Sequence, residues 1–266
     1  MRFLIALLLW TLPAFANGQC GPDTPCQIEN GSYHMDLPAS ADEPLPVLIF
    51  FHGHNATGKM IFRGGLQSNF KDKGYALIAP NGTMIQGRQT RRWAGRVGTA
   101  RDDVAFALDV LADAATRADL DLGRVYVAGF SAGGSMAWLM ACRAAERFAG
   151  FVSVSGALRR PNPTDNCPNA PVRFLHIHGF SDAQVPLEGR NIRDWHQGSV
   201  WDSLSLARTA NQCRSNPDAF DMGDMFRCRT WADSCGAGAI RFCGHDGGHG
   251  LPRGWTTLAR DWFEGG

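Results

Sequence analysis

The sequence predicts an α/β protein with a mostly parallel central sheet and helices on both of its faces. Short apolar runs alternate along the chain with longer segments whose apolar residues recur at helical spacing. The apolar runs lack polar alternation, which is typical of strands buried on both faces, as parallel strands are. The chain shows no internal repeat and no long linker, which favours one domain over residues 17–266.

The expected strands and helices follow one another from residue 46. Residues 80–82 (Pro-Asn-Gly) close the second strand with turn chemistry. Asp102 and Asp103 precede the first long helical segment, where carboxylates cap backbone N–H groups. We expect strands at 46–51, 75–79, 124–128, 150–154, 172–177 and 239–243, and helices at 103–118, after residue 131, at 200–212 and at 254–264.

One stretch specifies the kind of α/β protein. The strand at 124–128 runs into Gly-Phe-Ser-Ala-Gly at 129–133, and a helical pattern with Met136 and Met140 on one face follows. Strand, G-x-S-x-G and helix together form the context of a nucleophile elbow. The turn forces its serine into a strained conformation above the sheet, at the positive end of a helix dipole. We therefore predict the α/β-hydrolase fold, with Ser131 as the nucleophile.

The acid partner is expected after the nucleophile, at the carboxyl end of a later strand. Asp182 lies in the loop just past the strand at 172–177. Asp165 and Asp194 are weaker rivals because neither follows a strand directly. Asp182 is thus the expected acid.

The base is expected after the last strand. His249 lies in a glycine-rich loop that follows residues 239–243, and His245 is an alternative closer to the strand. Acyl transfer also requires donors for the developing oxyanion. We assign them to the backbone N–H groups of Ala132, which follows the nucleophile, and of His54, in the loop after the first strand. His52 is expected to brace that loop.

Metal chemistry is the alternative that the histidines raise. His52 and His54, and likewise His176 and His178, have H-x-H spacing, and alternate residues of a strand share a face. However, Phe180 stands where an H-x-H-x-D-H site needs its aspartate, and no H-E-x-x-H occurs. We therefore expect no metal and no cofactor.

The first 16 residues have the pattern of a signal peptide. Arg2 is followed by an apolar stretch and by Ala14-Phe15-Ala16, a small-residue cleavage site. The mature chain is expected to be secreted or periplasmic, and not to associate with a membrane after cleavage. Its net charge is +1, from 26 basic and 25 acidic residues, so overall charge does not favour binding to nucleic acid.

The eight cysteines are expected to form disulfides, because the chain is exported and none has C-x-x-C spacing. Residues 226–231 and 239–243 flank a turn and read as a hairpin. A turn centred between Cys235 and Gly236 places Cys228 opposite Cys243. A slip of one residue in the turn would break that pairing. The expected pairs are Cys20–Cys26, Cys142–Cys167, Cys213–Cys235 and Cys228–Cys243.

Several motifs together resemble a known family. They are Arg-Asp-Asp-Val-Ala-Phe at 101–106, the elbow with its strand at 121–134, His178-Gly179 with Asp182, and Gly-Gly-His at 247–249. The chain resembles the secreted esterases grouped with polyhydroxybutyrate depolymerases, feruloyl esterases and acetylxylan esterases. The resemblance extends over nearly all of residues 45–262. It places the nucleophile, acid and base of the family on Ser131, Asp182 and His249.

Two departures from the family pattern bear on the substrate. Members commonly have a tryptophan two residues after the histidine, where this chain has Leu251. Extracellular polymer depolymerases of this kind usually also carry a linker and a polymer-binding domain, which are not found here. The expected function is hydrolysis of carboxylic esters in a small molecule or a polymer, such as hydroxyalkanoate oligomers or feruloyl and acetyl esters on polysaccharides. A serine peptidase or acyltransferase with the same triad, and a non-catalytic binding module, are the alternatives.

Overall fold

The structure is a computed structural model that describes residues 20–85, 87, 90–93, 101–160, 167, 170–192 and 195–265. The expected signal peptide at residues 1–16 lies outside the described residues, as do the rival acids Asp165 and Asp194. No helix of the described part is long and apolar enough to span a membrane.

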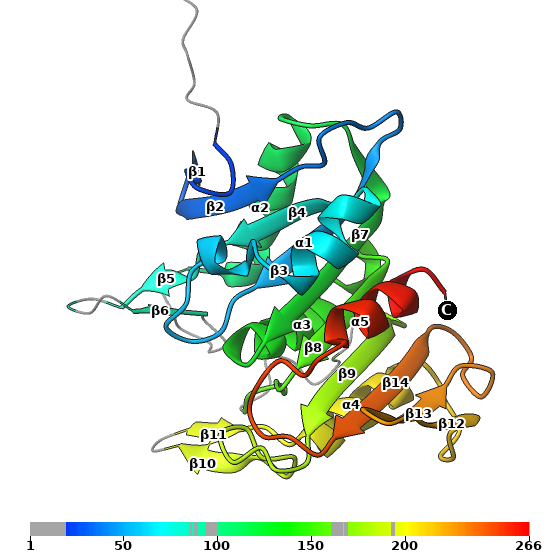
Figure 1. The fold of residues 1–266 in the computed structure, drawn as a ribbon. Helices are drawn as coiled ribbons and strands as arrows, with labels where there is room; N and C mark the ends of the chain where they lie inside the picture. Colours follow the sequence, from blue (N-terminus) through cyan, green and yellow to red (C-terminus); the bar gives the residue numbers. More distant parts are fainter. Residues whose placement is uncertain are drawn as a thin grey trace, which may run out of the picture.

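A ten-stranded sheet forms the centre of the described chain (Figure 1). Its six inner strands, from β4 to β14, are parallel, whereas the two strands at each edge are antiparallel. In spatial order the strands are β1 (Cys26–Ile28), β2 (Gly31–Asp36), β4 (Ala76–Pro80), β3 (Leu45–Phe51), β7 (Leu120–Phe130), β8 (Gly150–Val154), β9 (Arg173–Gly179), β14 (Ala239–His245), β13 (Arg227–Trp231) and β12 (Ala219–Met222).

Helices cover both faces of the sheet and divide the core into two layers (Figure 1). One layer packs under α2 (Asp103–Ala115), α3 (Ala132–Arg143) and α4 (Val200–Ala210). The other packs under α1 (Gly65–Asn69) and α5 (Trp255–Phe263). The predicted mostly parallel sheet with helices on both faces is therefore confirmed.

The apolar runs at the centre of the sheet explain why these strands were recognisable. Val127 and Ala128 of β7 are 0% exposed, as are Phe151 and Val152 of β8, because helices cover both of their faces. Asp102 caps α2 as expected, since its side chain accepts hydrogen bonds from the N–H groups of residues 104 and 105.

The strand at 226–231 was expected and is β13, but the edge strands β1, β2 and β12 and the small sheets were not expected from the sequence. β2 contains buried His34 and Asp36 among its apolar residues, and β12 exposes every residue, so neither shows the apolar run of a central strand. Two further small sheets pair β5 (Thr83–Met84) with β6 (Arg91–Arg92) and β10 (Arg190–Ile192) with β11 (Trp195–Gln197).

The disulfides join the cysteines in the expected pairs: Cys20–Cys26, Cys142–Cys167, Cys213–Cys235 and Cys228–Cys243. Cys228 and Cys243 face each other across the β13–β14 hairpin, with Cα atoms 4.1 Å apart.

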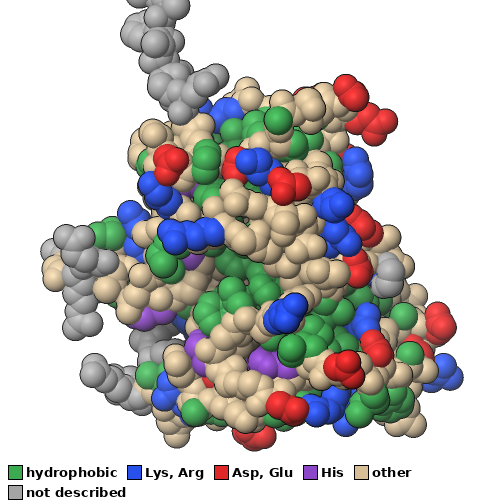
Figure 2. Space-filling view, in the orientation of Figure 1, with side chains coloured by type: hydrophobic (Ala, Val, Ile, Leu, Met, Phe, Trp, Pro, Cys, Tyr) green, Lys and Arg blue, Asp and Glu red, His purple; other side chains and the backbone are tan. Residues whose placement is uncertain are grey.

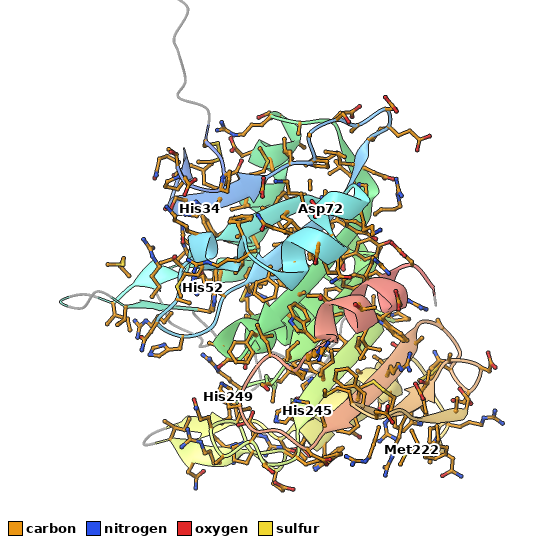
Figure 3. The ribbon with its side chains drawn as sticks, in the orientation of Figure 1. His34, His52, Asp72, Met222, His245 and His249 are labelled. Atoms are coloured by element: carbon orange, nitrogen blue, oxygen red, sulfur yellow. A yellow bond between two sulfur atoms is a disulfide. The ribbon has the colours of Figure 1, made fainter. Side chains whose placement is uncertain are left out.

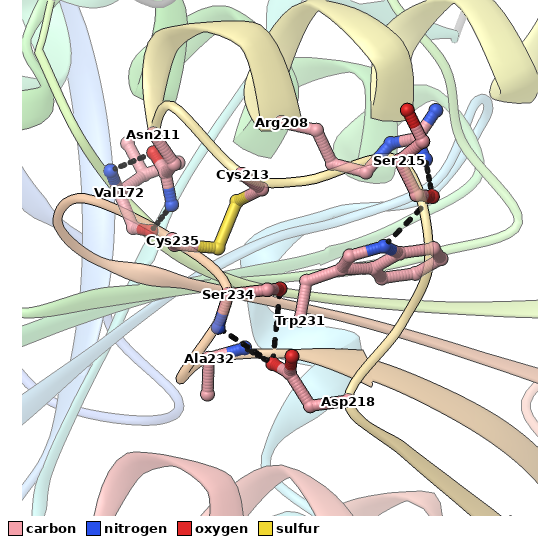
Figure 4. Close-up of a disulfide and its surroundings, with 10 residues drawn as sticks. All are labelled: Val172, Arg208, Asn211, Cys213, Ser215, Asp218, Trp231, Ala232, Ser234 and Cys235. Carbon is pink, nitrogen blue, oxygen red and sulfur yellow. Dashed lines mark hydrogen bonds between the residues drawn. A yellow bond between two sulfur atoms is a disulfide. The ribbon is translucent and has the colours of Figure 1, made fainter.

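Side-chain hydrogen bonds around the Cys213–Cys235 disulfide hold the segments that lead into β9 and β14 (Figure 4). Asn211 is fully buried, and its side-chain amide both accepts from the N–H of Val172 and donates to the Val172 carbonyl. Asp218 accepts hydrogen bonds from the backbone of Ala232 and from Ser234. These bonds fix the start of β9 and the turn before β14.

We expect the Cys228–Cys243 disulfide to stabilise the fold more than Cys20–Cys26 does. It links cysteines 15 residues apart, whereas the other pair is 6 residues apart, and the denatured chain loses more entropy when a longer loop is closed. Replacing both Cys228 and Cys243 by alanine should lower the free energy of unfolding by about 3 kcal/mol. Replacing both Cys20 and Cys26 by alanine should lower it by less. Urea denaturation measures both. An equal or larger loss for the Cys20/Cys26 variant would contradict this ranking.

Candidate active site

Ser131 lies in the turn that links β7 to α3. Its backbone has φ of 56° and ψ of −116°, a left-handed conformation that costs a non-glycine residue energy. The turn holds it there, because the Ser131 N–H donates to the Val154 carbonyl at the end of neighbouring β8, 2.8 Å away. The side chain is thereby raised above the carboxyl end of the sheet.

The glycines around Ser131 allow backbones to meet at distances that exclude a side chain. A Cβ atom on Gly129 would lie 2.1 Å from the carbonyl oxygen of Gly133. One on Gly133 would lie 1.9 Å from the carbonyl oxygen of Phe51 in β3, and one on Gly134 would lie 2.7 Å from that of Val154. The elbow therefore needs glycine at these positions for steric reasons.

The structure brings Ser131, His249 and Asp182 into contact. His249 Nε2 lies 2.8 Å from Ser131 Oγ, and His249 Nδ1 lies 2.8 Å from Asp182 Oδ2. The His249 ring packs beside Phe130, with ring centroids 5.1 Å apart. Figure 3 labels His249 and His245 in the lower half of the view, where Figure 2 shows histidine side chains reaching the surface.

The loops that carry the acid and the base are held together by backbone hydrogen bonds. β9 and β14 are parallel neighbours, so both loops leave the same edge of the sheet. The N–H of Phe180 donates to the carbonyl of His245, and that of Ser181 donates to the carbonyl of Gly247. Asp182 and His249 are therefore placed by one hydrogen-bonded unit.

Asp182 is buried and ionised. Burial by itself raises the pKa of its carboxyl, but the hydrogen bonds from His249 and from the Val185 N–H, with the nearby histidines, outweigh burial and lower the pKa below the ordinary value. Oδ1 accepts from the N–H groups of Gln184 and Val185, which leaves Oδ2 facing His249.

His245, the alternative base, occupies a different environment. Its ring is 5% exposed, Nδ1 accepts from the N–H of Gly247, and the ring lies edge-on to Phe226. The Ser131 hydroxyl instead donates its hydrogen bond to Nε2 of His249.

The loop after β3 lies directly beside the elbow. A Cβ on Gly53 would lie 3.3 Å from the Phe130 ring, so this loop packs against the residue that precedes the nucleophile. His54 is exposed in the same loop. Ala132 is the first residue of α3, where backbone N–H groups have no carbonyl of their own helix to bond.

His52 braces that loop from below. The N–H of Gly82 donates to His52 Nε2, so Nδ1 carries the proton and donates to the Gly53 carbonyl 2.7 Å away. Trp93 packs on the ring and donates its indole N–H to the His52 carbonyl. Burial lowers the pKa of His52 to about 4, so the ring is neutral near pH 7.

A pocket opens next to the elbow, and sequence reasoning did not find it. Most of its wall is apolar, and its members come from α3 and from two loops that are far apart in the sequence. No local sequence pattern relates these residues to one another. The pocket is lined by Trp93, Ala132, Ser135, Met136, Leu139, Leu158 and Arg159.

The H-x-H histidines of β9, His176 and His178, make hydrogen bonds within the protein. His176 bonds to Trp138 and His178, and His178 bonds to the Val185 carbonyl. Among the described residues, no group of three or more histidine, cysteine or acidic side chains is arranged to hold a metal ion.

Comparison with known proteins identifies the family. A family model described as the alpha/beta hydrolase fold matches residues 46–189, more than half of the chain. The chain therefore belongs to the α/β-hydrolase fold family. The expected esterase family within this fold is also supported, and the protein is a carboxylic ester hydrolase.

The curated relatives include feruloyl esterases. The chain is 27% identical to the probable feruloyl esterase C of Aspergillus niger over 263 residues, which cover 94% of this chain and 86% of the relative. It is 28% identical to the feruloyl esterase C of Emericella nidulans over 256 residues, covering 88% and 83%. Among solved structures, the acetyl xylan esterase from Aspergillus awamori superposes with a TM-score of 0.69 at 15% identity, covering 88% and 94% of the two chains.

We predict that the fold loses stability as the pH falls from 7 to 5. Burial lowers the pKa of His52 to about 4 and also lowers those of His176 and His178. The unfolded chain therefore takes up protons below about pH 6.5 while these folded-state rings stay neutral, which favours unfolding. His52 alone should lower the free energy of unfolding at pH 5 by about 2 kcal/mol. Urea denaturation at both pH values tests this, and an unchanged midpoint would contradict it.

Proposed function

We propose that the protein is an exported serine esterase that acts through an acyl-enzyme. The observation that carries the proposal is the continuous contact from Ser131 Oγ through His249 to Asp182, at a strained elbow. Four disulfides support export, because such bonds persist in oxidising compartments.

In the first half of the reaction, Ser131 Oγ attacks the ester carbonyl carbon and His249 Nε2 takes the serine proton. Asp182 accepts a hydrogen bond from His249 Nδ1, which keeps the correct tautomer and stabilises the imidazolium. The oxyanion of the tetrahedral intermediate accepts hydrogen bonds from the N–H groups of Ala132 and His54. His249 then gives its proton to the leaving alcohol, and the acyl group remains on Ser131.

In the second half, water attacks the acyl carbonyl carbon. His249 takes a proton from the water, and the same N–H groups hold the second oxyanion. Collapse of this intermediate releases the carboxylic acid and returns the proton to Ser131. Each turnover therefore consumes one ester and one water and yields one acid and one alcohol.

The proposed substrates are feruloyl or acetyl esters on a polysaccharide, or hydroxyalkanoate esters. The relatives named feruloyl esterase C, which align over most of the chain, support the first class.

Ser131→Ala should abolish esterase activity without unfolding the protein. The variant removes the nucleophile, so kcat should fall by about 10⁴-fold or more. Ser68→Ala, at an exposed position of α1, is the control and should behave like wild type. Methyl ferulate, p-nitrophenyl acetate, a hydroxybutyrate oligomer and a matching amide are the test substrates. A Ser131→Ala variant that retains more than a few per cent of activity would refute the mechanism, and faster cleavage of the amide would favour a peptidase.

Asp182→Asn should lower kcat by about 10³- to 10⁴-fold. The amide oxygen can still accept from Gln184 and Val185, which preserves the loop, but its NH₂ group would face His249 and favour the wrong tautomer. Asp246→Asn, in the neighbouring loop, is the control, because its exposed carboxylate pairs with Arg227. Steady-state kinetics decide the assignment: equal activity of both variants would move the acid role elsewhere.

A further inference from the structure

Two histidines lie beneath the acid loop, and the mechanism above does not use them. His176 and His178 are alternate residues of β9, and both are 0% exposed. Burying an imidazole is costly unless its nitrogen atoms find hydrogen-bond partners. The two rings meet this requirement through one chain of hydrogen bonds that starts at Trp138 in α3.

The chain of hydrogen bonds can run in one direction only. The Trp138 indole N–H can only donate, so His176 Nδ1, 3.3 Å away, accepts and Nε2 carries the proton. His176 Nε2 then donates to His178 Nδ1 over 3.0 Å. This leaves the proton of His178 on Nε2, which donates to the Val185 carbonyl over 2.7 Å. A donor at one end and a carbonyl at the other thus assign one tautomer to each ring.

The far end of this chain lies at the catalytic acid. The N–H of Val185 donates to Asp182 Oδ1 at 2.8 Å, and the carbonyl of the same residue accepts from His178. His178 Nε2 also lies 3.5 Å from Asp182 Oδ2, the atom that faces His249. His178 therefore contacts both the loop that carries the carboxylate and the carboxylate itself.

The start of the chain is rigid as well. The Trp138 ring stacks on Phe174, with centroids 3.7 Å apart, and both side chains are buried. The His176 ring also stacks on Phe242 of β14. The orientation of His178 is thus set by the packed core between α3 and the sheet, and not by the surface loop that it supports.

We propose that His178 is a positioning residue for Asp182, with its tautomer set by Trp138 and His176. This role rests on the proposed triad. The physical reason is that Asp182 must present Oδ2 to His249, and a displacement of about 1 Å in such a contact can cost about 100-fold in rate. A leucine would fill much of the same space but would leave the Val185 carbonyl without its donor.

The test compares His178→Leu with His178→Gln. The leucine variant should lower kcat by about 10- to 100-fold, with KM changed by less than about two-fold. The glutamine side chain keeps an N–H that can reach the Val185 carbonyl and should restore kcat to within about three-fold of wild type. His34→Leu controls for the loss of a buried histidine, because His34 lies on β2, far from His249 (Figure 3), and its kcat should be unchanged.

Two further measurements separate this proposal from the proposed function. The ¹H–¹⁵N NMR spectrum of the folded protein should show His176 and His178 protonated on Nε2. The Nδ1 proton of His249, bonded to Asp182, should keep its signal in His178→Gln and lose it in His178→Leu. These readouts do not depend on activity. If Ser131→Ala stayed active, the proposed function would fail while the NMR comparison still decided the positioning role.

If His178→Leu does not fold, Trp138→Phe takes its place. That variant keeps the ring stack but removes the N–H that sets the tautomer of His176, and kcat should fall about two- to ten-fold, the equivalent of one hydrogen bond. Wild-type kcat in the leucine variant, equal impairment of the leucine and glutamine variants, or Nδ1-protonated rings would each overturn the proposal.

Discussion

Helix α3 approaches the sheet so closely in its first turn that its backbone touches the carbonyl groups of β3 and β8. Glycines at 129, 133 and 134 leave room for this contact, and the hydrogen bond from Ser131 to Val154 locks the turn between them. The strained conformation of Ser131 is therefore maintained by packing on three strands. The loop after β3 and the pocket beside Ala132 take their positions from the same contact.

The sequence could predict those parts of the fold in which a local residue pattern is compatible with only one kind of structure. The apolar strands β3, β4, β7, β8, β9 and β14 are buried on both faces, so composition alone located them. Ser131, Asp182 and His249 were predicted as one set because each follows such a strand, and the structure brings these three into contact. The hairpin register that pairs Cys228 with Cys243 followed from the length of the turn between its strands.

The rest depended on contacts between distant segments. Trp93 donates a hydrogen bond to the His52 carbonyl, although the two residues are 41 positions apart in the sequence. No local sequence pattern at either residue predicts this contact. His176 and His178 could be read as metal ligands from their spacing, and only the position of Trp138 shows that they form a hydrogen-bond chain. β12 escaped detection because an exposed edge strand has no buried face to impose alternation.

The disulfides Cys213–Cys235 and Cys228–Cys243 cross along the chain, because each closes a loop that contains one cysteine of the other. Of these four cysteines, Cys213 and Cys228 come first in the chain, so pairing in the order of the sequence would join two cysteines that are not native partners. The native pattern therefore requires the β13–β14 hairpin to form before oxidation is complete, or requires an isomerase to exchange the bonds. A compartment that oxidises cysteines but does not isomerise disulfides would accumulate chains with non-native disulfides.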